Sequence, residues 1–174
     1  MFYQNIRGLR TKQLEFYDVC ASNYEIICLS KTWLNDLCYD HNLFPNQYTV
    51  YRSDRPYINK VRGGGALTAI TASLGSCRRR YDLELCSECV WVEVPSADGI
   101  NMLIGNHYFS PYTKLEVITA YFRQLENILD TNNTRVILSQ PQHFWKYVSN
   151  FRKHRSGSIN LEVDGTHLVQ PEAC

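Results

Sequence analysis

The sequence predicts an α/β fold, and three features of the chain support this prediction. Residues 26–29 form an apolar run long enough for a buried strand, and polar residues follow it at once. Residues 2–6 predict a strand and residues 11–21 a partly amphipathic helix, so these segments together predict a βαβ unit. Residues 114–129 carry an apolar stripe at helical spacing, which predicts a helix packed on the core.

The remaining strands are predicted from short runs of β-branched and apolar residues. They fall at residues 48–51, 66–72, 90–94, 100–108 and 135–138. With 174 residues and 44% hydrophobic content, the chain is expected to form one packed domain, or one domain with an appendage.

Charge and hydropathy exclude several classes of protein. A formal net charge of +1 gives no overall attraction to polyanions, so any contact with nucleic acid must come from local clusters of cations. No apolar run approaches the roughly 18 residues of a membrane helix, and the first residues do not have the pattern of a signal peptide. We expect an intracellular protein, nuclear or cytoplasmic, without a membrane partner.

The cysteines do not have the spacing of a disulfide framework. There are seven, scattered along the chain, and most lie in apolar contexts typical of reduced core thiols. Cys86 and Cys89 form a Cys-x-x-Cys motif, but no second ligand pair follows to complete a tetrahedral zinc site. We therefore interpret this motif as the beginning of a strand.

The stretch 24–36 carries the most specific motif. Its segment Ile-Ile-Cys-Leu-Ser-Lys-Thr-Trp-Leu-Asn resembles the Ile-Ile-x-Leu-Thr-Glu-Thr-Trp-Leu of endonucleases in jockey-like non-LTR retrotransposons, members of the endonuclease/exonuclease/phosphatase superfamily. This resemblance implies two packed mixed sheets flanked by helices. Where that family carries the glutamate that holds its divalent metal, this chain has Lys31.

Two further motifs extend the resemblance. The N-terminal strand resembles the family's Tyr-x-Asn-Val-Arg-Gly-Leu, which gives Asn5 a place beside metal and scissile phosphate, although an asparagine at a strand end also suits a turn. Gly105-Asn106-His107-Tyr108 resembles Gly-Asn-x-Tyr, which implies that Tyr108 contacts the scissile phosphate. The candidate catalytic residues are therefore Asn5, Asn106 and Tyr108, and we expect Asn5, Lys31 and Tyr108 to meet at one sheet edge.

Local basic clusters are candidate contacts for nucleic-acid phosphates. Arg52 and Arg55 lie in a segment that resembles the family's Tyr-Arg-x-Asp-Arg, Arg62 follows nearby, and Arg79 is the centre of a second basic run that we expect in a loop. Cations with interleaved aromatic residues suit a surface that follows a phosphate backbone. The alternative is that these arginines are ordinary solvated loop residues.

The C-terminal part departs from the family. The strand at 135–138 should lead into Gly-Asp-Phe-Asn, but Ser139-Gln-Pro-Gln follows instead. From residue 142 the chain resembles the connector between endonuclease and reverse transcriptase. We therefore expect an incomplete two-sheet α/β sandwich at 1–139 and a connector-like segment at 140–174, with a peripheral helix at 142–155.

The resemblance implies a phosphodiester hydrolase that uses one divalent ion, usually magnesium. The ammonium of Lys31 cannot coordinate that ion, and the family's Ser-Asp-His segment is missing with the Gly-Asp-Phe-Asn motif. We favour a degenerate, inactive DNA endonuclease that binds neither magnesium nor a small-molecule cofactor. The alternatives are a non-catalytic nucleic-acid-binding domain and an active magnesium-dependent endonuclease.

Overall fold

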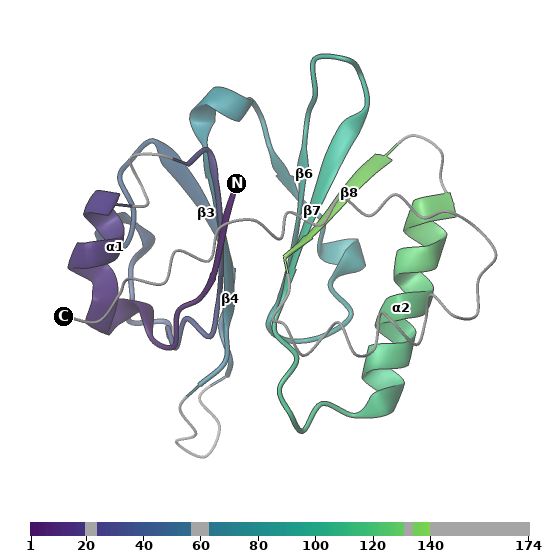
Figure 1. Ribbon diagram of the computed structural model, residues 1–174, viewed down its shortest axis with the longest axis horizontal. Coiled ribbons are helices and arrows are strands. Elements are labelled where there is room, and N and C mark those ends of the chain that lie inside the picture. Colours follow the sequence, from purple (N-terminus) through teal and green to yellow (C-terminus); the bar gives the residue numbers. More distant parts are fainter. Residues whose placement is uncertain (20–23, 57–62, 131–133, 140–174) are drawn as a thin grey trace.

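A computed structural model of the chain describes residues 1–19, 24–56, 63–130 and 134–139. Two four-stranded sheets pack face to face, and each carries one α-helix on its outer side (Figure 1). None of the described helices is long and apolar enough to cross a membrane.

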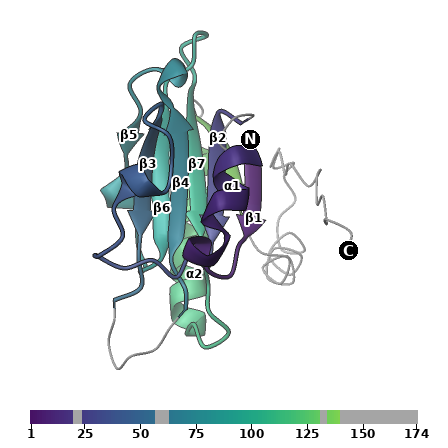
Figure 2. The same cartoon turned by 90° about the vertical axis from the view of Figure 1, so that its left-hand side faces the viewer.

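The N-terminal sheet has the strand order β1-β2-β4-β3. Its strands are β1 (Phe2–Asn5), β2 (Ile26–Ser30), β3 (Tyr48–Ser53) and β4 (Ala66–Thr71). Strands β1 and β2 are parallel and are joined through α1 (Gln13–Val19), as predicted, whereas β4 is antiparallel to both of its neighbours. Figure 2 shows α1 in front of this sheet, over β1 and β2.

The C-terminal sheet repeats this plan with the strand order β5-β6-β7-β8. Its strands are β5 (Arg78–Arg79), β6 (Cys89–Val94), β7 (Asn101–His107) and β8 (Thr134–Ser139). Strands β7 and β8 are parallel, and α2 (Leu115–Asp130) lies between them in the chain. Short 3₁₀ turns complete the described part: η1 (Leu9–Lys12), η2 (Asp40–Asn42), η3 (Ala72–Leu74) and η4 (Tyr81–Leu83).

Three apolar layers hold these elements together. The layer between the sheets contains Ile26, Cys28, Ala66, Ile70, Val90, Val92, Val94 and Ile104. Alternate residues of the same strands face outward, where Leu29 packs with Phe16 of α1 and Leu103 packs with Phe122 of α2. Burial of each such side chain stabilises the fold by about 1.5–3 kcal/mol. Because successive residues of a strand face opposite sides of the sheet, the strands bury one set of side chains between the sheets and the other under the helices.

The expected α/β class and the predicted strands and helices of the described part are confirmed, with bounds that shift by one or two residues. The run at Arg78 to Arg80 is a correction, because a strand and not a loop contains Arg78 and Arg79. The register of β5 against β6 brings Arg78 opposite Glu93, and this pairing orders the segment. The connector-like segment at 140–174, with its predicted helix, lies outside the described residues.

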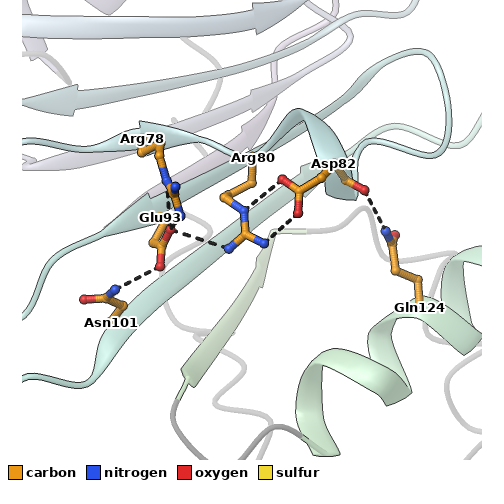
Figure 3. A network of polar contacts seen from close by, with 6 residues as sticks. All are labelled: Arg78, Arg80, Asp82, Glu93, Asn101 and Gln124. Carbon is orange, nitrogen blue, oxygen red and sulfur yellow. Dashed lines mark hydrogen bonds and ion pairs between the residues drawn. The ribbon is translucent and has the colours of Figure 1, made fainter.

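A network of polar contacts connects β5 to its surroundings (Figure 3). Arg78 and Arg80 both contact the carboxylate of Glu93, at 2.6 and 3.5 Å, and Arg80 also pairs with Asp82 at 2.6 Å. Hydrogen bonds from the arginine side chains hold the pKa values of Glu93 and Asp82 below their usual range. Arg78 and Arg80 therefore form ion pairs with carboxylates of the same chain.

Candidate functional site

The candidate site lies where β1 and β2 end. Asn5, the last residue of β1, is in register with Ser30, the last residue of β2. Lys31 directly follows Ser30. Because parallel strands end at the same edge of a sheet, Asn5 and Lys31 lie at one edge. Asn5 Oδ1 is buried there and has no hydrogen-bond partner among the described residues.

The loop after β2 is held in an unusual conformation. Lys31 and Trp33 both have a φ of +56°, a region that residues other than glycine rarely adopt. Backbone hydrogen bonds on both sides hold the loop; among them, Gly8 N donates to Lys31 O at 2.9 Å, and Trp33 N donates to Gly64 O at 3.0 Å. The loop is thus fixed between the turn after β1 and the glycine segment before β4.

Lys31 and Tyr108 come together across the two sheets. The ammonium of Lys31 lies 5.3 Å from the centroid of the Tyr108 ring, a cation–π contact. Within the described ranges, Lys31 has no carboxylate within ion-pair distance. Its positive charge is therefore not neutralised by those residues.

Tyr108 follows β7 and is buried. Its backbone N–H donates to Glu88 O at 3.0 Å, which anchors the residue beside the turn before β6. Burial raises the pKa of the Tyr108 phenol, while the nearby Arg55 lowers it by less. The phenol is therefore protonated at neutral pH and can donate a hydrogen bond to a phosphate oxygen.

A buried ion pair borders Tyr108. Arg55 donates from Nε to Glu88 Oε1 at 2.5 Å and from Nη2 to Oε2 at 3.0 Å, and Gly65 N donates to the same Oε1 at 3.0 Å. The Glu88 hydrogen bond raises the pKa of Arg55, and its guanidinium carbon lies 5.9 Å from the Tyr108 ring centroid. A Cβ at Gly64 would overlap this carboxylate, so the glycine makes room for the pair.

An open cleft of about 450 Å³ lies against Tyr108 and this ion pair. The segment before α2 contributes Ser110, Thr113 and Lys114, and the turn before β6 contributes Cys86. Cations, hydroxyls and a protonated phenol are donors that suit an oxyanion such as a phosphate.

Asn106 is fully buried between the sheets. Its Nδ2 donates to Leu67 O at 2.7 Å and to Leu29 O at 3.2 Å, and its Oδ1 accepts from Ser139 Oγ at 3.1 Å. The side chain thus joins β7 and β8 to the opposite sheet. Its catalytic role stays a prediction.

Three of the four predicted nucleic-acid-binding arginines, Arg52, Arg55 and Arg79, lie within the described residues, and all three pair with carboxylates. Arg52 pairs with Asp40 at 3.0 Å and with Asp54 at 3.2 Å, and Arg79 donates to both carboxylate oxygens of Glu84. Arg79 also donates to Arg52 O at 2.9 Å, so these two lie together, whereas Arg55 lies at the cleft. Arg62 lies outside the described residues.

The donors at this edge do not suit magnesium, which prefers carboxylate oxygens. The edge offers the ammonium of Lys31 and the amide of Asn5, while the nearby carboxylate of Glu88 is already bound by Arg55. The described part of the chain has no group of three or more His, Cys, Asp or Glu placed to hold a metal ion.

Sequence reasoning missed Glu88 as a residue of this site. Its partner Arg55 is 33 residues away, and no local pattern connects the two residues. One signal was present: an ionisable residue directly precedes the apolar run of β6, and a charge at such a position needs a partner.

Comparison with solved structures identifies the fold. The endonuclease domain of TRAS1, a telomere-specific non-LTR retrotransposon, aligns with a TM-score of 0.52 and 14% identity over 82% of this chain and 61% of that domain. The catalytic domain of Xenopus laevis APE2 aligns with a TM-score of 0.54 and 16% identity over 79% and 56%. An endonuclease/exonuclease/phosphatase family protein from Leptotrichia buccalis aligns with a TM-score of 0.50 and 11% identity, over 77% of this chain and 64% of that protein.

The chain therefore has the α/β fold of the endonuclease/exonuclease/phosphatase superfamily. It is similar in fold to a retrotransposon endonuclease domain and spans about three-fifths of that domain's length. No family model matches the sequence, and no curated protein matches it.

Proposed function

We propose that this chain is a degenerate endonuclease domain of the retrotransposon type that does not hydrolyse phosphodiesters. The observation that carries the proposal is the position of Lys31 at the end of β2, with its ammonium against Tyr108. In the resemblance found in the sequence, this position belongs to the metal-binding glutamate.

An ammonium at that position opposes a divalent cation. A unit charge and a divalent ion about 4 Å apart repel by roughly 8 kcal/mol at an effective dielectric of about 20. A Glu-to-Lys exchange therefore removes an oxygen ligand and adds repulsion in the same step. The Gly-Asp-Phe-Asn and Ser-Asp-His segments, which the resemblance leads one to expect, are also missing from the sequence.

The test is a plasmid-nicking assay with magnesium. We expect no conversion of supercoiled to open-circular DNA by the purified chain, with or without a chelator. Nicking by the wild-type chain that a chelator abolishes would refute the proposal. A mock preparation from the same host, carried through the same columns, controls for contaminating nuclease.

A second candidate function is non-catalytic binding of nucleic acid, and the cleft favours it. Lys31 and Lys114 are without ion-pair partners in the described part, and both lie near the protonated phenol of Tyr108. Such donors can neutralise phosphates without any metal.

A mobility-shift assay over a range of salt concentrations separates this function from the first. If DNA binds at the cleft and at Lys31, which lies against the Tyr108 ring, Lys31→Ala should weaken binding and reduce the salt slope by about one. Arg123→Ala, on the exposed face of α2, is the matched control and should change neither quantity. If the wild-type chain gives no salt-dependent shift, the binding function is excluded, and only the proposal of a degenerate endonuclease domain remains.

A further inference from the structure

The Cys-x-x-Cys motif forms a tight thiol pair next to the cleft. Residues 87 and 88 form a turn, so Cys86 and Cys89 lie at its two ends, and Glu88 within it has a φ of +66°. The ends of a β-turn lie within about 7 Å, close to the Cα separation of about 4.4–6.8 Å that a disulfide needs. The two thiols also interact, because each shifts the pKa of the other.

The two thiols differ in access. Cys86 is half-buried and lines the cleft, whereas Cys89 is completely buried at the beginning of β6. Behind Cys89 lies His107, whose Nδ1 is 2.9 Å from Cys89 Sγ. A small thiol reagent in the cleft would therefore meet Cys86 first.

The interaction between the two thiols shifts their pKa values in opposite directions. The Cys89 thiol lowers the pKa of Cys86, and the same contact raises the pKa of Cys89. Burial lowers the pKa of His107 to about 3, so its ring is neutral and positions Cys89 without adding a charge. The negative charge thus develops on Cys86, the accessible sulfur, and a thiolate is the reactive form of cysteine.

We propose that Cys86 and Cys89 form a thiol–disulfide exchange site for low-molecular-weight disulfides of the glutathione class. The thiolate of Cys86 attacks one sulfur of the small disulfide, forms a mixed disulfide and releases one thiolate. Cys89 then attacks Cys86 Sγ, which forms the protein disulfide, and the Cys89 proton passes to the departing sulfur, so that the second half of the small disulfide leaves as a thiol. The protein dithiol is oxidised by two electrons, and the small disulfide is reduced by two.

Oxidation would act on the cleft through the turn. The new disulfide closes a ring that contains Glu88, whose carboxylate holds Arg55 and whose carbonyl accepts from Tyr108 N. The redox state of the pair is therefore coupled to the position of the cleft's donors. This inference does not depend on the proposed function.

Mass spectrometry of the full chain tests the proposal with oxidised glutathione as the probe. We expect wild-type protein to form a Cys86–Cys89 disulfide with little glutathione left on Cys86. In Cys89→Ser the second step is blocked, so glutathione on Cys86 should rise at least about tenfold. Cys77→Ser is the matched control, because Cys77 is similarly half-buried but its thiol pKa is raised by burial; it should behave as wild type.

A second measurement on wild-type protein does not depend on any variant folding. In brief labelling with N-ethylmaleimide at neutral pH, Cys86 should react at least about tenfold faster than Cys77. Equal labelling of the two, glutathione that persists on Cys86 of wild-type protein, or a disulfide that maps to other cysteines would each overturn the proposal.

Discussion

Asn106 shows how one side chain can join two sheets. Its amide donates to carbonyls of β2 and β4 and accepts from Ser139 of β8, all in a buried layer. Asn106→Ala removes these three buried hydrogen bonds, and the loss of one such bond costs about 0.5–1.5 kcal/mol. We expect urea unfolding to show a loss of about 2–4 kcal/mol in the free energy of unfolding.

Asn101→Ala is the control for this prediction. Asn101 makes one half-buried bond, from Nδ2 to Glu93 Oε1 at 2.9 Å, at the opposite end of the same strand. Its loss should cost less than about 1 kcal/mol. Equal losses for the two variants would show that Asn106 does not join the sheets.

His107 makes stability depend on pH. Burial lowers its pKa from 6.5 to about 3, so the folded protein keeps a neutral ring that the unfolded chain would protonate below pH 6.5. The stabilisation is complete above pH 6.5 and is lost as the pH falls toward 3. Between pH 7 and pH 5 we expect urea unfolding to show a loss of about 2 kcal/mol.

Two comparisons isolate this effect. The described carboxyl groups with lowered pKa values are Asp82, Glu93 and Asp98. The stability that they contribute is lost only as the pH falls below their unfolded values of 3.8 to 4.5, so they contribute little between pH 7 and pH 5. His41→Gln, a change at an exposed residue of η2, should keep the full dependence on pH. Stability that is constant from pH 7 to pH 5 would contradict the assignment to His107.

At the residue scale, sequence patterns located Lys31 and Tyr108 but not their neighbours. A motif places a residue on a strand end, and the sheet then brings strand ends together, which is why Lys31 and Tyr108 could be expected at one edge. Glu88 could not be found this way, because its role depends on a contact with Arg55 across the fold.

At the scale of elements, the glycine segment before β4 combines two requirements. Gly64 has a φ of +72°, and a Cβ there would overlap the Arg55–Glu88 pair; Gly99 has a φ of +79° with open space around it. Gly99→Ala therefore measures backbone strain alone, about 1–2 kcal/mol. Gly64→Ala should cost at least about 2 kcal/mol more in urea unfolding, because it also displaces a buried ion pair.

The fold of the variants separates the two contributions. In Gly64→Ala the shifted Glu88 turn should also alter the Tyr108 environment, which tyrosine fluorescence or the Tyr108 ring resonances would report. Gly99→Ala should leave both unchanged. Equal destabilisation by the two substitutions would mean that the carboxylate moves aside without cost.

Strands and helices were predictable because alternation and helical periodicity survive in this chain. The expected loop at Arg78 to Arg80 was wrong for a reason outside local sequence. A run of three arginines disfavours a strand on its own, but Glu93 and Asp82 pair with Arg78 and Arg80 (Figure 3). Glu84 pairs with Arg79 in the same way. From the sequence alone these cations are candidates for binding phosphates, whereas in the fold they pair with carboxylates of the same chain.

At the scale of the whole molecule, the two sheets each supply part of the edge. The N-terminal sheet brings Asn5 and Lys31, the C-terminal sheet brings Tyr108, and the inter-sheet layer sets their separation. Face-to-face packing followed only from the family resemblance, since periodicity identifies buried faces but not which faces meet.

The last prediction concerns magnesium binding at the edge to which both sheets contribute residues. Lys31→Glu replaces the repelling ammonium with a carboxylate beside Asn5, so isothermal calorimetry should detect weak magnesium binding by this variant and none by the wild-type chain. The gain should not restore nicking, because hydrolysis also needs groups that manage protons, and mutually dependent catalytic groups do not contribute additively.

Lys114→Glu is the matched control, since it makes the same charge change within the cleft but away from the end of β2. It should bind magnesium no better than wild type. If Lys114→Glu binds as well as Lys31→Glu, the gain reflects net charge alone and Lys31 is not at a former ligand position. If Lys31→Glu both binds magnesium and nicks DNA, the chain has kept its proton-transfer groups, and a single substitution separates it from an active enzyme.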